Sequence, residues 1–222
     1  CVLVGLGVDP ALAEGPVSTA TLLRNLYSLE TLPLEQDERC RQFASFDRSG
    51  GNEDFGNYLA WDNVKDGKGT ALLAEMQGPG AIVRIWSANP KGVLRIYIDG
   101  APAPAIEAPM TALLGGAVAG IPVPLAGERS RGWNLYLPIP YAKHCKVTSD
   151  EGDFYYHVNY RTYAAGAKVA SFTMADLQRA RDKVLDIAAK LLSTREEVPP
   201  PAGRVKNPFD AKLQPDEEKV LF

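Results

Sequence analysis

Histidine, cysteine and clustered basic residues are scarce in this sequence. Its 222 residues include 2 His and 3 Cys, and the formal net charge is −3. The cysteines lie far from one another, and neither CxxC nor HxxxH spacing occurs, so we expect no metal site. No block of Lys or Arg occurs, so nucleic acid is not an expected partner. The field of the whole molecule favours no charged partner of either sign.

Long apolar runs and the common catalytic signatures are also missing. No stretch reaches the roughly 18 apolar residues that span a bilayer, and we expect no membrane partner. The Gly-rich segment 47–54 lacks the Lys-Ser/Thr ending of a phosphate loop, and Pro10 stands where a dinucleotide fingerprint needs its third glycine. Neither a Ser elbow, an HExxH motif nor a Cys–His arrangement is present. We therefore predict no cofactor.

The first residues are typical of an exported protein. Residues 1–8 (CVLVGLGV) are apolar, and the run 11–13 (ALA) fits the small-x-small pattern of a signal cleavage site. We predict that residues 1–13 are a signal-peptide remnant and that the protein is secreted or periplasmic. A buried N-terminal strand is the alternative, although Asp9-Pro10 suits a strand poorly.

Short alternating runs fill the middle of the chain. The runs 81–88 (AIVRIWSA) and 93–99 (VLRIYID) have period two, and straight alternation places Arg84 and Trp86 on the same face as Ile82. Further runs lie at 71–77, 105–108, 121–125, 133–138, 145–149 and 154–163. So many strands, with turn signals about every 8 to 12 residues, predict an all-β fold, an antiparallel jelly-roll β-sandwich.

Helical periodicity brackets this strand region. Residues 19–30 form a predicted amphipathic helix, and a closing helix begins after Thr173, a natural N-cap. A run of three prolines follows it, which favours an extended spacer. The expected organisation is a jelly-roll domain over 14–193 with a flanking C-terminal α-helix, then a Pro-rich linker over 194–222 towards a missing second jelly roll.

Two stretches combine groups that suit sugar binding. In the loop 43–57, Arg48 offers a bidentate fork and Asn52 and Asp54 offer acceptors, although composition alone favours an ordinary solvated turn. In the run 154–161, alternate residues form a polar stripe headed by an aromatic ring, which the solvent face of a strand explains equally well. That stripe consists of Tyr155, His157, Asn159 and Arg161.

For three residue types the sequence leaves alternatives open. Trp61 is the better candidate for stacking on a sugar, because Trp86 lies among aliphatic residues and is expected in the core. Retaining glycosidases need two carboxylates about 5 Å apart, and no such pair is local in the sequence; Glu107 is interpreted as a structural ion-pair partner. Cys40 and Cys145 either form a disulfide or remain buried free thiols.

Three stretches together resemble glycoside hydrolase family 172. They are the loop 45–52 (SFDRSGGN), the run 78–116 and the run 133–163, in the family's order. The loop matches the family pattern at Asp47, Arg48, Gly50, Gly51 and Asn52. The resemblance implies tandem jelly rolls, homo-oligomers that are trimers or multiples of trimers, and retaining cleavage of furanosides without an essential metal. It places the catalytic glutamates in the second jelly roll, so no catalytic residue is assigned here.

We therefore expect the N-terminal portion of a secreted glycoside hydrolase acting on α-fructofuranosides or arabinofuranosides, inactive as these 222 residues. Its partner is a carbohydrate substrate. The alternative is a non-catalytic jelly roll that binds carbohydrate or builds an assembly. The predicted substrate-binding residues are Asp47, Arg48, Asn52, Asp54, Trp61 and His157.

Overall fold

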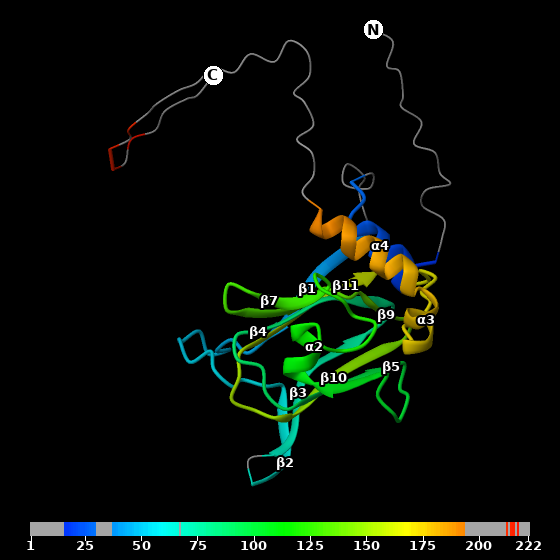
Figure 1. Ribbon diagram of the computed structural model, residues 1–222. Helices are drawn as coiled ribbons and strands as arrows, with labels where there is room; N and C mark the ends of the chain where they lie inside the picture. The colour runs from blue at the N-terminus through cyan, green and yellow to red at the C-terminus, as the bar shows by residue number, and fades with distance from the viewer. Residues whose placement is uncertain are drawn as a thin grey trace.

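The computed structural model describes residues 16–29, 37–66 and 68–193, together with four residues near the C-terminal end. Two antiparallel sheets face each other (Figure 1). The six-stranded sheet consists of β1 (Glu38–Ala44), β11 (Tyr156–Tyr163), β4 (Gly80–Ser87), β8 (Gly132–Leu135), β7 (Ala126–Arg129) and, paired with β4, β9 (Ile139–Tyr141). The five-stranded sheet consists of β2 (Ala60–Lys65), β3 (Lys68–Gln77), β10 (His144–Glu151), β5 (Val93–Ile98) and β6 (Ile106–Pro109).

Strand pairing is nested along the chain. β1 pairs with β11, β3 with β10, β4 with β9, and β5 with β6. A chain that folds back on itself and is then wrapped into two sheets gives this order, which is that of a jelly roll. The predicted antiparallel jelly-roll β-sandwich is therefore confirmed.

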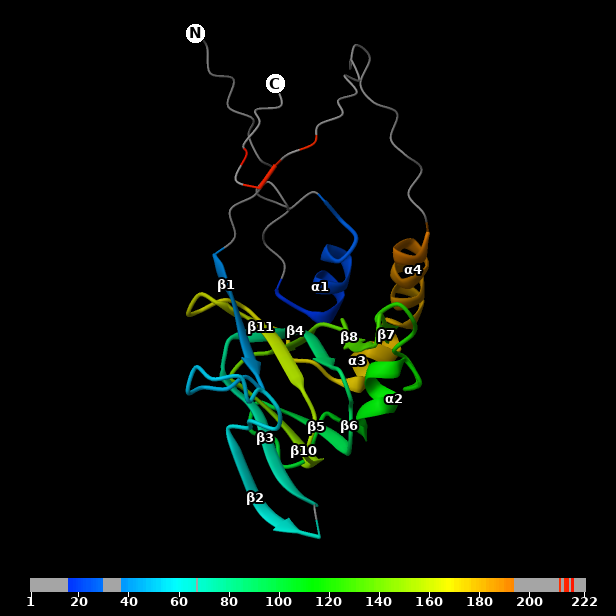
Figure 2. The same cartoon turned by 90° about the vertical axis from the view of Figure 1, so that its left-hand side faces the viewer.

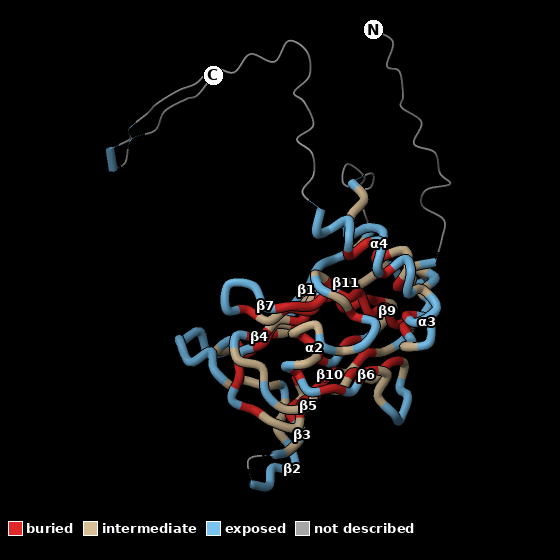
Figure 3. Tube along the Cα trace, in the orientation of Figure 1, coloured by how far each residue is buried: buried red, intermediate tan, exposed pale blue. Residues whose placement is uncertain are grey.

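The core lies between the two sheets, where Figure 3 shows the buried segments of facing strands. Alternate residues of β5 and β10 point into it, among them Leu94, Ile96 and Val147, each 0% exposed. Period-two burial of aliphatic side chains is what fixes one face of each strand towards the other sheet.

One hydrogen bond joins the sheets through the core. Relative to β10, β3 has one extra residue, Leu73, so that a β-bulge interrupts the ladder. The Leu73 carbonyl accepts a hydrogen bond of 3.0 Å from the hydroxyl of Tyr156, a buried residue of β11. The bulge thus provides an acceptor, and the opposite sheet supplies its donor.

Helices cover only part of the six-stranded sheet. Its outer side carries α1 (Thr19–Asn25) and α4 (Arg181–Leu192) over one end (Figures 1 and 2). α1 begins at Ser18, whose side chain caps the helix in a capping box. At the other end, where the loop 45–59 and the β7–β8 hairpin lie, no described helix covers the outer side.

The helix boundaries differ from those predicted. The N-terminal helix ends at Asn25 instead of continuing to 30. The closing helix is two helices, α3 (Met174–Arg179) and α4, because Ala180 adopts φ −88° and ψ 9°, outside the helical range. A short helix that the sequence analysis missed, α2 (Met110–Gly115), follows β6.

The predicted strands also need correction. The run 121–125 is not a strand, because Pro122 and Pro124 cannot donate to a ladder and Leu125 N bonds Pro122 O in a turn. β1, β2, β7 and β9 were not predicted. β7 and β9 are only 4 and 3 residues long, and β1 is an edge strand with five consecutive polar or small residues and no apolar alternation. Its first apolar side chain that packs on the core is Phe43.

Most residues at the two ends of the chain lie outside the described residues. The predicted signal-peptide remnant at 1–13 lies outside the described residues, as does nearly all of the predicted linker at 194–222. Both stay predictions. None of the described helices has the length and apolar character needed to cross a membrane.

Tyr156→Phe tests the bond between the sheets. The variant leaves the buried Leu73 carbonyl without its donor, so we expect the free energy of unfolding to fall by about 1 to 3 kcal/mol. Tyr141 is the matched control: it is equally buried, and its hydroxyl has no hydrogen-bond partner among the described residues. Tyr141→Phe should cost far less. Urea unfolding measures both, and equal losses would refute the assignment.

Candidate functional site

The Gly-rich loop after β1 is built around the carboxylate of Asp47. Asp47 Oδ1 accepts hydrogen bonds from Ser49 N (2.9 Å) and Ser49 Oγ (2.6 Å), and Oδ2 accepts one from Glu53 N (3.3 Å). The Ser49 hydroxyl is the main cause of the lowered pKa of Asp47. A side chain at Gly51 would begin 2.5 Å from Asp47 Oδ2 and would displace the carboxylate from its hydrogen bonds. The carboxylate therefore organises the loop.

The side chains of Arg48 and Asp54 also form hydrogen bonds that hold this loop. Arg48 Nη2 donates to Ala44 O at 3.0 Å, and its guanidinium lies 4.9 Å from the ring centre of Phe46. Asp54 Oδ1 accepts from Asp47 N at 2.8 Å. Asn52 is exposed, and within the described residues its side chain has no hydrogen bond. Of the predicted binding residues in this loop, Asn52 is the one whose side chain makes no hydrogen bond to a described residue, and exposed Asp54 keeps its Oδ2 unbonded.

Trp61 packs on the core, whereas Trp86 does not. Trp61 lies against the Tyr58 ring, with centroids 5.1 Å apart, and packs on the core. A methyl group added at Gly152 would overlap its ring, so the indole lies flat against this backbone. Trp86 instead lies on the outer side of the six-stranded sheet, against the backbone of Gly132. The prediction that Trp86 fills the core was wrong, whereas the predicted stacking of the partly buried Trp61 on a sugar stays a prediction.

A β-bulge in β4 explains the position of Trp86. Asn159 pairs with Arg84 and Tyr160 with Ile82, so Val83 is an extra residue. Ile82 is fully buried, whereas Arg84 and Trp86 point outward. The straight alternation assumed from the sequence does not include this extra residue.

The polar stripe of β11 lies where the sequence predicted. Tyr156, Val158 and Tyr160 are buried, while His157 and Asn159 are only partly buried and face outward. Neighbouring strands add polar groups to the same side. Together they form a surface that we call the outer patch, which consists of Gln42, Arg84, Trp86, Asn134, His157 and Asn159.

Hydrogen bonds hold the outer patch in place. Arg84 Nε and Nη2 both donate to Asn134 Oδ1, at 3.2 and 2.9 Å. Asn159 Nδ2 donates to Gln42 Oε1 at 2.8 Å. The Trp86 and His157 rings lie 4.8 Å apart between centroids, at 39°. These side chains are oriented without any ligand.

The electrostatics of the outer patch are dominated by Arg84. Burial lowers the pKa of His157, and the Arg84 guanidinium lowers it further. His157 is therefore uncharged at neutral pH. Arg84 forms no ion pair with any of the residues that the structure describes. The outer patch consequently carries one positive charge without a carboxylate partner.

Three carboxylates of the five-stranded sheet contact basic side chains. Glu107 Oε1 lies 2.8 Å from Arg95 Nε, and Asp150 Oδ2 lies 3.7 Å from Arg95 Nη2. Glu75 Oε1 lies 3.1 Å from His144 Nε2. The interpretation of Glu107 as a structural ion-pair residue is confirmed.

The two cysteines of the domain do not form a disulfide. Cys145 is a fully buried free thiol in β10, and burial raises its pKa. Cys40 is a free thiol that is exposed on β1. The free-thiol alternative is therefore the one that the structure shows, although only one of the two thiols is buried.

Comparison with known families gives one match. Residues 36–180 match the model described as "GH172 first beta-sandwich domain". The matched range runs from just before β1 to the end of α3 and includes every strand of both sheets. No curated protein matches the chain.

Gly152→Ala tests the packing of Trp61. The added methyl group would collide with the indole, so we expect a loss of about 1 to 3 kcal/mol in the free energy of unfolding. Trp61→Leu in the same variant removes the obstacle and should recover part of the loss. Thermal or urea unfolding gives both values. Unchanged stability of Gly152→Ala would show that Trp61 lies elsewhere.

His157 should make the fold sensitive to mild acid. Its pKa is lowered in the folded chain, so the unfolded chain, with an ordinary pKa of about 6.5, binds the proton first. Stability is then complete above about pH 6.5 and falls as the pH decreases towards the folded pKa. Unfolding free energies at pH 7.5 and 5 should differ more in the wild type than in His157→Gln. An identical pH dependence would contradict the assignment.

Proposed function

This chain belongs to glycoside hydrolase family 172, and we propose that it is the non-catalytic N-terminal portion of an enzyme that cleaves furanosides. The supporting observation is the match of its complete sandwich to the family's first β-sandwich domain. We further propose α-fructofuranosides or arabinofuranosides as substrates, with the catalytic glutamates supplied from outside these residues.

The state of the carboxylates supports a non-catalytic role. Retaining cleavage needs one carboxylate free to attack and a second that holds a proton. Glu107 and Asp150 both contact Arg95, and Glu75 contacts His144. These three carboxylates already have partners among the described residues, so none of them is free to act as the attacking or the proton-donating group.

The Gly-rich loop is the proposed contribution of this domain to a sugar pocket. Asp47, Arg48 and Asp54 shape it, and Asn52 is left exposed for a sugar hydroxyl. Phe55, 45% exposed, contacts Tyr155 at the head of β11, with centroids 5.1 Å apart. An exposed amide beside aromatic rings suits recognition of a sugar face.

The proposal also covers the oligomeric state of the protein and its cellular location. We propose that the protein acts as a homo-oligomer, a trimer or a multiple of trimers, in which this loop borders the pocket of its own or a neighbouring subunit. We also propose, from residues 1–13, that it is secreted or periplasmic. Gel filtration with light scattering and cell fractionation test these two proposals.

The purified 222-residue chain should show no turnover of aryl α-arabinofuranoside or fructofuranoside probes. A longer product of the same reading frame that contains a second sandwich should cleave one of them. Turnover by the 222-residue chain that disappears in Glu107→Gln would falsify the assignment. Arg95→Gln is the matched control, because it breaks the same ion pair while Glu107 remains.

A second function, carbohydrate binding without cleavage, is favoured by the outer patch. Its side chains are oriented in advance, it includes an aromatic ring, and no described helix covers it. This function needs neither a second sandwich nor a catalytic carboxylate.

A further inference from the structure

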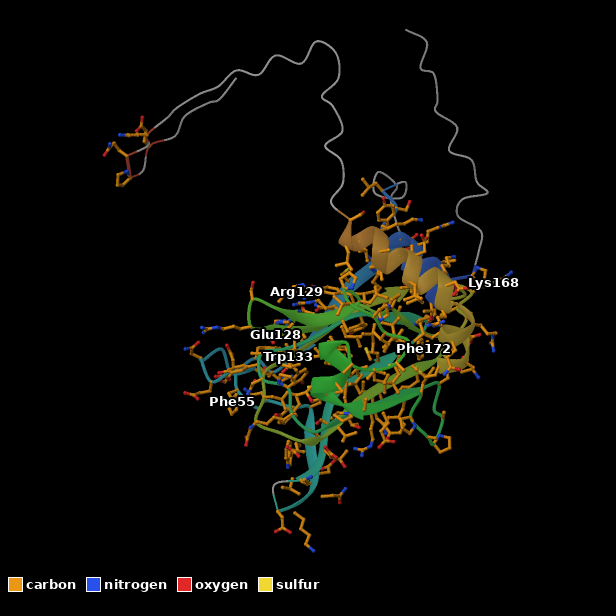
Figure 4. All side chains as sticks on the ribbon, in the orientation of Figure 1. Phe55, Glu128, Arg129, Trp133, Lys168 and Phe172 are labelled. Atoms are coloured by element: carbon orange, nitrogen blue, oxygen red, sulfur yellow. The ribbon has the colours of Figure 1, made fainter. Side chains whose placement is uncertain are left out.

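The uncovered end of the six-stranded sheet carries a concentration of arginine. Arg84 of β4 is joined by Arg129 and Arg131 of the β7–β8 hairpin. Both hairpin arginines are exposed and form no ion pair among the described residues. Figure 4 shows Arg129 and Phe55 at the end of the molecule opposite Lys168 and Phe172. The exposed Glu128 of the same hairpin pairs with Trp133, whereas Arg129 pairs with Gly132, the residue against which Trp86 lies. Arg129 therefore lies on the side of the outer patch and Glu128 on the other side of the ribbon.

Arg84 is the fixed cation of this surface. Its two bonds to Asn134 Oδ1 orient the guanidinium, and Asn134 is itself held by a bond of 2.9 Å from its Nδ2 to Gly132 O. The Tyr136 ring lies 5.8 Å from the guanidinium and restricts it from another side. A guanidinium has five N–H donors, so donors remain for a ligand oxygen.

Trp86 supplies an aromatic surface next to this cation. Because residue 132 is glycine, the indole lies directly against the backbone of β8. On β11 the His157 ring adjoins it, and the exposed Tyr155 lies just before this strand in the chain. Aromatic faces bordered by fixed amides and hydroxyl-binding groups suit the flat, partly apolar faces of sugar rings.

We propose that the outer patch binds an acidic glycan, in which a sugar ring stacks on Trp86 and its carboxylate accepts hydrogen bonds from Arg84. Arg129 and Arg131 attract the anionic chain, and the exposed Gln42, held by its hydrogen bond from Asn159, meets a neighbouring hydroxyl group. The site is independent of the proposed furanoside cleavage. It needs no residue outside the described chain.

The positive charge of this surface favours an acidic glycan as its ligand over a second copy of this chain. A symmetric interface would place each outer patch against its own copy, so Arg84, Arg129 and Arg131 would meet like charges. A neutral glycan would leave the Arg84 charge partly desolvated and unpaired. A carboxylate compensates that charge with a bond of defined geometry.

Tryptophan fluorescence and calorimetry with a galacturonic-acid oligosaccharide test the proposal, against a galactose oligosaccharide of equal length. We expect the acidic ligand to bind more tightly and to lose affinity as salt increases. Arg84→Gln should weaken binding about tenfold or more, the loss of one charge-assisted hydrogen bond. Arg84→Lys should retain part of the affinity, and Trp86→Phe should remove the fluorescence change.

Arg95→Gln is the matched control, since it removes an arginine of the other sheet that is already paired with Glu107. It should leave affinity unchanged. Each variant is compared by thermal unfolding, so that loss of binding is separated from loss of fold. Equal affinity for both oligosaccharides, an unaffected Arg84→Gln variant, or self-association that Arg84→Gln abolishes would overturn the proposal.

Discussion

The pairing of β11 between β1 and β4 is the constraint on which both faces of this protein depend. It directs Tyr156, Val158 and Tyr160 into the core and leaves His157 and Asn159 outside. A slip of one residue would exchange these sets and bury a histidine and an amide among aliphatic side chains. Because the hydrophobic face is so strongly specified, the position of the outer polar groups is fixed as well, with no contribution from a ligand.

Two β-bulges, one in each sheet, determine which groups point into the core and which point outward. In β3 the extra residue Leu73 presents a carbonyl to the Tyr156 hydroxyl and so joins the sheets. In β4 the extra residue Val83 turns Arg84 and Trp86 outward, beside His157. The first bulge stabilises the core and the second assembles the outer patch. Both follow from one residue inserted opposite a regular strand.

The sequence predicts those parts in which local pattern and tertiary structure agree. The alternation of β11 and β5, the jelly-roll class and the capped start of α3 at Thr173 all emerge from it. The bulge at Val83 has no local signal, since VRIW alternates equally well in either register. The pairing of Trp61 with Gly152 joins residues far apart in the chain, and Asp47 bonds within its own loop, which composition cannot distinguish from ligand binding. Polar edge strands such as β1 have no apolar period to detect.

Thiol labelling along β11 tests the central constraint most directly. In a background with Cys1 and Cys40 replaced by serine, the buried Cys145 remains. Single cysteines are introduced at positions 157, 158, 159 and 160, and their rates of reaction with a thiol reagent are compared under native conditions. The account predicts fast labelling at 157 and 159 and slow labelling at 158 and 160. Uniform rates, or the opposite alternation, would contradict the arrangement on which both sides of the sheet depend.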